Sequence, residues 1–127
     1  MLLALDVGNT HTVLGVYSGA ELVDRWRVTT HQHRTSDELS VLMKSLFDSS
    51  KVVSADQIDA AIVSSVVPSV TQRIVEMADR LFNVRCRVVG PGLKTGMPIL
   101  YEDPREVGAD RIVNAVAAYH RWPEGLI

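Results

Sequence analysis

The pattern of apolar and polar positions predicts three consecutive strands at the start of the chain. Residues 2–5 form an apolar run that ends at Asp6, and apolar positions resume at 13–16 after a short polar turn. A second turn at 17–20 leads into residues 21–28, where apolar and charged positions mix as they do in a half-exposed strand. Because both connections are short, neighbouring strands are expected to be antiparallel.

Helices and strands are expected to alternate in the rest of the chain. Thr35 and Glu38 have the spacing of a capping box, and Pro68 suits the first turn of a second helix. Residues 58–64 and 85–89 are expected to form strands, the first of them buried on both faces. The apolar faces of three helices are predicted to consist of Leu39, Leu42, Met43, Leu46 and Phe47, then Val70, Ile74, Met77, Ala78 and Leu81, and finally Ile112, Ala115, Val116 and Tyr119.

Two features of the second half of the sequence indicate a long loop and a continuation of the chain. Gly90-Pro91-Gly92 ends the last predicted strand, and residues 93–106 form a long connection of the kind that is usually functional or mobile. After the third helix, Trp122-Pro123-Glu124-Gly125 breaks the helical pattern, and Leu126-Ile127 resembles the beginning of another strand. We therefore expect a natural continuation of the chain.

Composition narrows the class of protein. The chain has 127 residues, of which 46% are hydrophobic and 22% charged, as expected for one globular domain. A net charge of −2 gives no electrostatic reason to expect nucleic acid or an anionic membrane as a partner. No apolar run is long enough to span a bilayer, and Cys86 has no second cysteine to pair with. We expect a cytoplasmic protein in which Cys86 is a small core residue.

The segment Asp6-Val7-Gly8-Asn9-Thr10 carries the strongest chemical signal. Gly8 and Asn9 tolerate positive φ, so the backbone can turn sharply and direct its amides to one point. Thr10 and Thr12 add hydroxyl donors. A carboxylate beside such donors suits a metal-bound phosphate, although an ordinary Asx-type hairpin turn gives the same pattern.

Other polar positions are less specific. His31 and His33 could chelate a metal, but no third ligand with suitable spacing is visible, so we expect an exposed loop. Ser64 and Ser65 follow a predicted strand, where open α/β sheets place ligands. We favour a helix cap as their role.

The order of elements predicts an α/β, ribonuclease-H-like lobe of the actin-like or sugar-kinase type. It would contain a mixed five-stranded sheet, with three antiparallel strands first and flanking helices. Phosphotransferases and metal-dependent nucleases both use this arrangement with an acid at the end of the first strand. The nuclease alternative needs further acids after the later strands, where the sequence has Ser64-Ser65 and Gly90-Pro91-Gly92 instead.

An ordered set of motifs resembles the type III pantothenate kinase family. The set comprises Asp6-Val7-Gly8-Asn9-Thr10, Gly90-Pro91-Gly92, Tyr101-Glu102-Asp103-Pro104 and Gly108-Ala109-Asp110-Arg111, and the resemblance runs from residue 1 to 127. It implies phosphorylation of pantothenate by ATP, the first step toward coenzyme A.

The resemblance also implies roles for individual residues. Asp110 would be the catalytic base, with Asp6 near a magnesium ion and holding it indirectly. Arg111 would help to hold pantothenate. The alternatives are that Asp110 only stabilises the helix dipole and that Arg111 belongs to a surface ion pair. The ATP phosphates would be bound by Asp6, Val7, Gly8, Asn9, Thr10, His11, Thr12 and Val13, and pantothenate by Tyr101, Gly108, Ala109, Asp110 and Arg111.

Family members have two lobes and are homodimers, so the resemblance implies an incomplete N-terminal portion with little activity alone. Residues 1–106 would form the N-terminal lobe, and residues 107–127 an interlobe helix and the start of a second lobe. The monovalent-cation site, for K⁺ or NH₄⁺, would lie mostly outside this chain. A non-catalytic binding lobe is the third hypothesis, beside the kinase and the nuclease.

Overall fold

Five strands form one mixed sheet with the strand order β3-β2-β1-β4-β5. The computed structural model describes residues 1–90 and 92–124. β1 pairs with β2, and β2 with β3, in antiparallel fashion, whereas β1–β4 and β4–β5 are parallel pairs. The elements are β1 (Leu2–Val7), β2 (His11–Ser18), β3 (Glu21–Thr29), α1 (Ser36–Ser49), β4 (Ala60–Ser65), α2 (Pro68–Phe82), β5 (Cys86–Val88) and α3 (Ala109–Arg121), with short 3-10 turns at Ala55–Gln57 and Pro104–Glu106. The predicted mixed sheet, with three antiparallel strands first, is confirmed.

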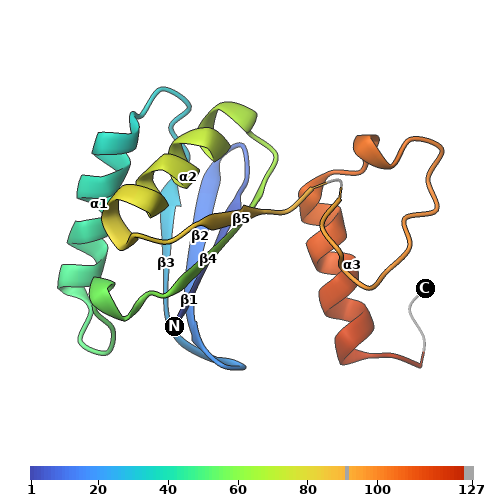
Figure 1. Ribbon diagram of the computed structural model, residues 1–127, viewed down its shortest axis with the longest axis horizontal. Helices are drawn as coiled ribbons and strands as arrows, with labels where there is room; N and C mark the ends of the chain where they lie inside the picture. Colours follow the sequence, from blue (N-terminus) through green and yellow to red (C-terminus); the bar gives the residue numbers. More distant parts are fainter. Residues whose placement is uncertain (91, 125–127) are drawn as a thin grey trace.

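Helices α1 and α2 cover one face of the sheet (Figure 1). Side chains alternate across β1, so that Leu3, Leu5 and Val7 are buried under these helices while Asp6 is on the other face. The helices contribute the apolar faces predicted from their spacing, with Leu42, Leu46 and Leu81 only partly buried. The main core consists of Leu3, Leu5, Val7, Leu14, Val16, Leu39, Met43, Phe47, Val53, Ile58, Ala61, Val63, Val67, Val70, Ile74, Met77, Ala78, Phe82 and Cys86.

An aromatic cluster joins α1 to the sheet and to α2. The Phe47 ring lies 5.2 Å from the Trp26 ring and 5.3 Å from the Phe82 ring, measured between centroids. Both tilted geometries are favourable for aromatic pairs. Phe47 is only 3% exposed, so it links three elements inside the core.

The predicted capping box at the start of α1 is confirmed. The Thr35 hydroxyl accepts a hydrogen bond from the Glu38 amide at 3.2 Å, and the Glu38 carboxylate accepts one from the Thr35 amide at 2.7 Å. The backbone hydrogen bond from Thr35 is the main reason that the pKa of Glu38 is lowered. These bonds satisfy amides that the first turn leaves without helical partners.

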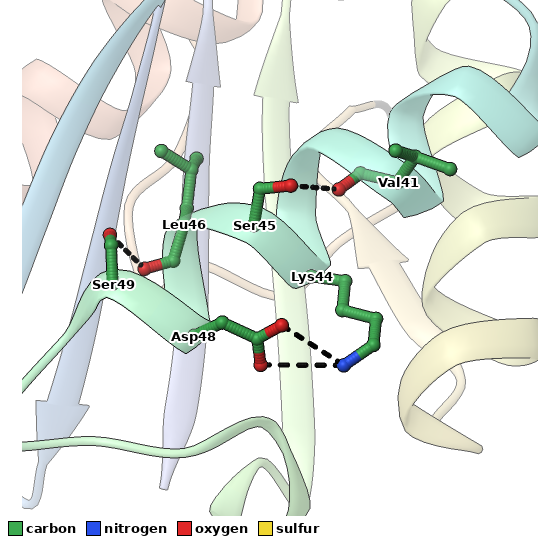
Figure 2. A network of polar contacts seen from close by, with 6 residues as sticks. All are labelled: Val41, Lys44, Ser45, Leu46, Asp48 and Ser49. Carbon is green, nitrogen blue, oxygen red and sulfur yellow. Dashed lines mark hydrogen bonds and ion pairs between the residues drawn. The ribbon is translucent and has the colours of Figure 1, made fainter.

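The polar contacts drawn in Figure 2 stay within α1, whereas Asp37 in its first turn pairs with Arg80 of α2. Lys44 and Asp48 form an exposed ion pair at 3.0 Å. The Ser45 hydroxyl donates to the Val41 carbonyl at 2.9 Å, and the Ser49 hydroxyl to the Leu46 carbonyl at 2.7 Å. Exposed pairs of this kind contribute little to stability, so α1 is held mainly by its buried face.

Helix α3 lies on the opposite side of the sheet from α1 and α2 (Figure 1). Its residues Ala109 and Ile112 pack with Val89 into a second, smaller buried cluster. Tyr119, predicted to be buried, is 51% exposed, because this cluster involves α3 only as far as Val116. The predicted strand start at residues 126–127 lies outside the described residues, as does Pro91.

Strand β4 differs from its prediction in two ways. It begins at Ala60, two residues later than predicted, because Ile58 ends the preceding 3-10 turn. It is also not buried evenly on both faces: Ala61 and Val63 are buried, but Ala60 is exposed and Ile62 only half-buried. The reason is that α3 covers only part of the second face of the sheet.

Cys86 is a core residue, as predicted. It is 6% exposed at the start of β5, which is shorter than the predicted range 85–89. Burial raises the pKa of its thiol to about 11, so the reactive thiolate is scarce at neutral pH. Within the described ranges, none of the helices has the length and hydrophobicity that a bilayer crossing requires.

Candidate active site

The loop between β1 and β2 is closed by a close approach of backbone groups. The Gly8 amide donates to the His11 carbonyl at 2.9 Å, and a Cβ at Gly8 would lie 3.2 Å from that carbonyl oxygen. The expected use of positive φ at Gly8 and Asn9 is wrong, because neither is among the described residues with positive φ. Glycine at position 8 is therefore explained by space rather than by backbone conformation.

Asp6 lies at the edge of a cavity of about 370 Å³ on the sheet face opposite α1 and α2. Its side chain is exposed, and no hydrogen bond or ion pair joins it to another residue in the described parts of the chain. Val13, its partner in the β1–β2 register, lines the same cavity. The cavity is lined by Ala4, Leu5, Asp6, Val13, Leu14, Gly15, Tyr17, Leu22, Arg25, Ile62, Ser64, Val89 and Val113.

Thr12 does not contribute its hydroxyl beside Asp6, contrary to the prediction. It pairs with Val7 in the register, and both residues are buried. Its hydroxyl is 2.8 Å from the hydroxyl of Thr30. Because successive residues of a strand point to opposite faces, Thr12 and Val13 cannot both face Asp6.

Ser64 and Ser65 do not cap α2 through their side chains, and the predicted cap is wrong. The N-cap residue is Val67, with Pro68 in the first turn as predicted. The Ser65 hydroxyl accepts from the Val67 amide at 3.0 Å and can donate to the Val67 carbonyl at 3.2 Å, which forms a local turn before the helix. Ser64 instead lines the cavity beside Asp6.

One charged residue of the cavity was not predicted from the sequence. Arg25 in β3 pairs in register with Gly15 and lines the cavity near Tyr17. A Cβ at Gly15 would lie 3.0 Å from the Tyr17 ring, so the glycine leaves room for that ring. The alternation of charged and apolar residues along β3 could have placed Arg25 on this face. Its place at the cavity depends on the register of β3 with β2, which the sequence does not give.

Asp110 lies in the first turn of α3, as predicted. Its neighbour Ala109 packs on Val89, which lines the cavity that contains Asp6. The carboxylate folds back over Gly108, since a Cβ at Gly108 would lie 2.5 Å from Asp110 Oδ1. The start of α3 is thus at the same edge of the sheet as the carboxyl ends of β1 and β4, where α/β folds place ligands.

The predicted substrate residues, Tyr101 and Gly108 to Arg111, do not line this cavity, and Asp110 is no exception. Arg111 is exposed and lines a second cavity, of about 220 Å³, between α3 and residues 95–99. Tyr101 is 58% exposed and lines neither cavity.

The histidines at 31 and 33 lie in an exposed loop, as expected. Over residues 1–90 and 92–124, no group of three or more His, Cys, Asp or Glu side chains is arranged to hold a metal ion.

The family model for type III pantothenate kinase matches residues 2–127. The chain belongs to the type III pantothenate kinase family. Three similar proteins, each named type III pantothenate kinase, come from Myxococcus xanthus, Exiguobacterium sp. and Pelobacter propionicus. The chain is 54%, 54% and 55% identical to them over all 127 residues, which cover 49%, 50% and 50% of these relatives.

The resemblance to the type III pantothenate kinase family, inferred from the motifs, is therefore confirmed at the level of the family. The chain spans about half the length of the curated relatives it matches. All of the candidate residues from Asp6 to Arg111 fall within the part that matches the type III pantothenate kinase family.

Proposed function

We propose that this chain is the N-terminal portion of an enzyme that transfers a phosphoryl group from ATP to pantothenate, giving 4'-phosphopantothenate in coenzyme A biosynthesis. The observation that carries the proposal is the match of the type III pantothenate kinase family to residues 2–127. The exposed Asp6 carboxylate at the carboxyl edge of the sheet supports it.

The segment from Asp6 to Val13 is the proposed ATP-phosphate site. Its backbone amides and the Thr10 hydroxyl would donate to phosphoryl oxygens, while the Thr12 hydroxyl, bonded to Thr30, would support the hairpin. Asp6 would hold hydrated Mg²⁺ indirectly. When bound, the cation neutralises charge that develops on the transferred phosphoryl group.

Asp110 is the proposed catalytic base. Phosphoryl transfer depends mainly on positioning and charge neutralisation, so a carboxylate that orients the attacking hydroxyl and accepts its proton is sufficient. The first turn of α3 favours a negative charge at this position. Tyr101 and Arg111, which the structure leaves exposed, would close on pantothenate together with Gly108 and Ala109.

The segment that contains α3 is proposed to contact a second lobe and a second copy of the protein. Residues 1–106 would then be the first lobe, and residues 107–127 an interlobe segment. Exposed apolar side chains support these contacts rather than the boundary, since Leu100 is 94% exposed and Tyr119 and Trp122 are more than half exposed. A K⁺ or NH₄⁺ site would belong mostly to the other lobe, and the homodimer would function in the cytoplasm.

The test compares the purified 127-residue chain with the complete product of its gene. We expect pantothenate-dependent release of ADP from the complete protein. The chain alone should have at most trace activity, because a two-lobed cleft requires the full length of the family, of which the chain covers about half. A coupled assay of ADP release measures both. Full activity of the isolated chain would contradict the two-lobe requirement, and inactivity of the complete protein would contradict the proposed function.

A substitution at Gly108 should separate positioning of Asp110 from folding. Gly108→Ala puts a Cβ 2.5 Å from the present position of Asp110 Oδ1, so the carboxylate must move. The backbone conformation (φ −61°, ψ 143°) is one that alanine adopts freely. We expect kcat of the complete protein to fall about 10- to 100-fold, since small displacements of a catalytic group are costly. The melting temperature should change little.

Gly90→Ala is the matched control for this variant. A Cβ at Gly90 meets nothing within 4 Å, so kcat and stability should both stay near the wild-type values. Equal kcat values for Gly108→Ala and the wild type would show that the position of the Asp110 carboxylate does not limit turnover.

A further inference from the structure

Ser64 has the one buried side-chain polar atom without a hydrogen-bond partner in the described part of the chain. The residue is 6% exposed at the carboxyl end of β4. An unpaired buried hydroxyl destabilises the folded protein, whereas alanine at this position would carry no such cost. The neighbouring Ser65 uses its hydroxyl fully in bonds to Val67. The free hydroxyl of Ser64 therefore points to a partner in another state of the protein.

The sheet register identifies that partner. Ser64 lies directly opposite Asp6 in the parallel β1–β4 pair, so their side chains leave the sheet on the same face. Both line the 370 Å³ cavity, in which Arg25 is the other charged residue. Arg25 is two register rows away, since it pairs with Gly15, and Gly15 pairs with Ala4. Arg27 shares the row of Asp6 but is separated from it by Val13.

We propose that Ser64 is a positioning residue for Asp6: its hydroxyl donates to the Asp6 carboxylate when a cation–phosphate group occupies the site. This inference rests on the proposed function. Neighbouring strands are about 5 Å apart, so a rotation of the Ser64 side chain about χ1 can bring its Oγ toward the carboxylate. A hydroxyl-to-carboxylate bond is short and strong, and it would fix a side chain that otherwise has no described partner.

The experiment measures the Mg²⁺ concentration needed for half-maximal ATP binding to the complete gene product, by titration calorimetry. Ser64→Ala should raise this concentration about 10-fold, as expected for a lost hydrogen bond to a charged group. Its melting temperature should equal or exceed that of the wild type, because an unpaired buried hydroxyl is removed. Ser64→Cys, which keeps the volume but is a weak donor, should behave like Ser64→Ala.

Two further variants distinguish positioning from structure. In an Asp6→Asn background, Ser64→Ala should change the Mg²⁺ requirement much less than it does in the wild-type background. The reason is that the carboxylate to which Ser64 would donate is gone. Ser65→Ala, the matched control, should lower the melting temperature and leave the Mg²⁺ requirement unchanged, because its bonds are local to Val67.

The outcomes distinguish a failure of this inference from a failure of the proposed function. If wild-type protein binds ATP with Mg²⁺ and Ser64→Ala has the same Mg²⁺ requirement, the inference is overturned and the proposed function stands. An effect of equal size in the Asp6→Asn background also overturns it, because the hydroxyl would then act on another group. Wild-type protein without Mg²⁺-dependent ATP binding would overturn the proposed function and this inference together.

Discussion

Replacement of Asp110 with asparagine is expected to lower kcat for pantothenate phosphorylation by the complete protein about 10³-fold. A positioned general base typically contributes 10²–10⁴-fold, and asparagine keeps the shape of the side chain but cannot accept the proton of the attacking hydroxyl. Asp110 lies in the first turn of α3 with its carboxylate over Gly108, so the substitution changes charge rather than packing. Steady-state kinetics with saturating ATP and pantothenate measure the effect.

A stability measurement and a matched variant serve as controls for this result. Loss of the favourable interaction with the helix N-terminus should cost less than about 1 kcal/mol, which denaturation of the variant measures. Asp79→Asn removes an exposed helical carboxylate from α2, on the other side of the sheet, and should leave kcat unchanged. A fall of less than about 3-fold for Asp110→Asn would exclude Asp110 as the catalytic base.

Replacement of Phe47 with alanine is expected to destabilise the chain by about 3–5 kcal/mol, as large-to-small changes of buried aromatic residues do. The ring is 3% exposed and packs between Trp26 and Phe82, so its loss leaves a cavity where β3, α1 and α2 meet. Urea denaturation followed by tryptophan fluorescence measures the free energy of unfolding, with Trp26 as a reporter next to the cavity.

Val41→Ala is the control on the same helix. Val41 is 68% exposed, so its truncation should change the free energy of unfolding by less than about 0.5 kcal/mol. If Phe47→Ala lost less than about 1 kcal/mol, the aromatic cluster would not be the link between α1 and the sheet.

Elements with a strong local signal were predictable from the sequence. The capping box at Thr35 and Glu38 and the proline at position 68 mark helix starts through local hydrogen bonding and backbone restriction, which depend on neighbouring residues alone. Element ends were predicted less well, because tertiary context decides them. Ile58, apolar like the strand that follows it, ends a 3-10 turn instead of joining that strand.

The candidate site was predictable as a set of segments but not as a three-dimensional arrangement. The motifs indicated the family, yet which face each side chain takes follows from register. Thr12 faces α1 and α2 while Ser64 faces the cavity, and no local pattern distinguishes these two hydroxyls. The role proposed for Ser64 rests on its register partner, Asp6, and on its missing hydrogen bond, neither of which the sequence alone reveals.

Mass spectrometry of the reaction product tests the central claim most directly. The complete gene product is incubated with ATP, Mg²⁺ and pantothenate, and the acceptor is analysed. The account predicts 4'-phosphopantothenate, formed in equal amount with ADP and formed about 10³-fold more slowly when Asp110→Asn replaces the wild type. Unmodified pantothenate, or ADP released without a phosphorylated acceptor, would contradict the account.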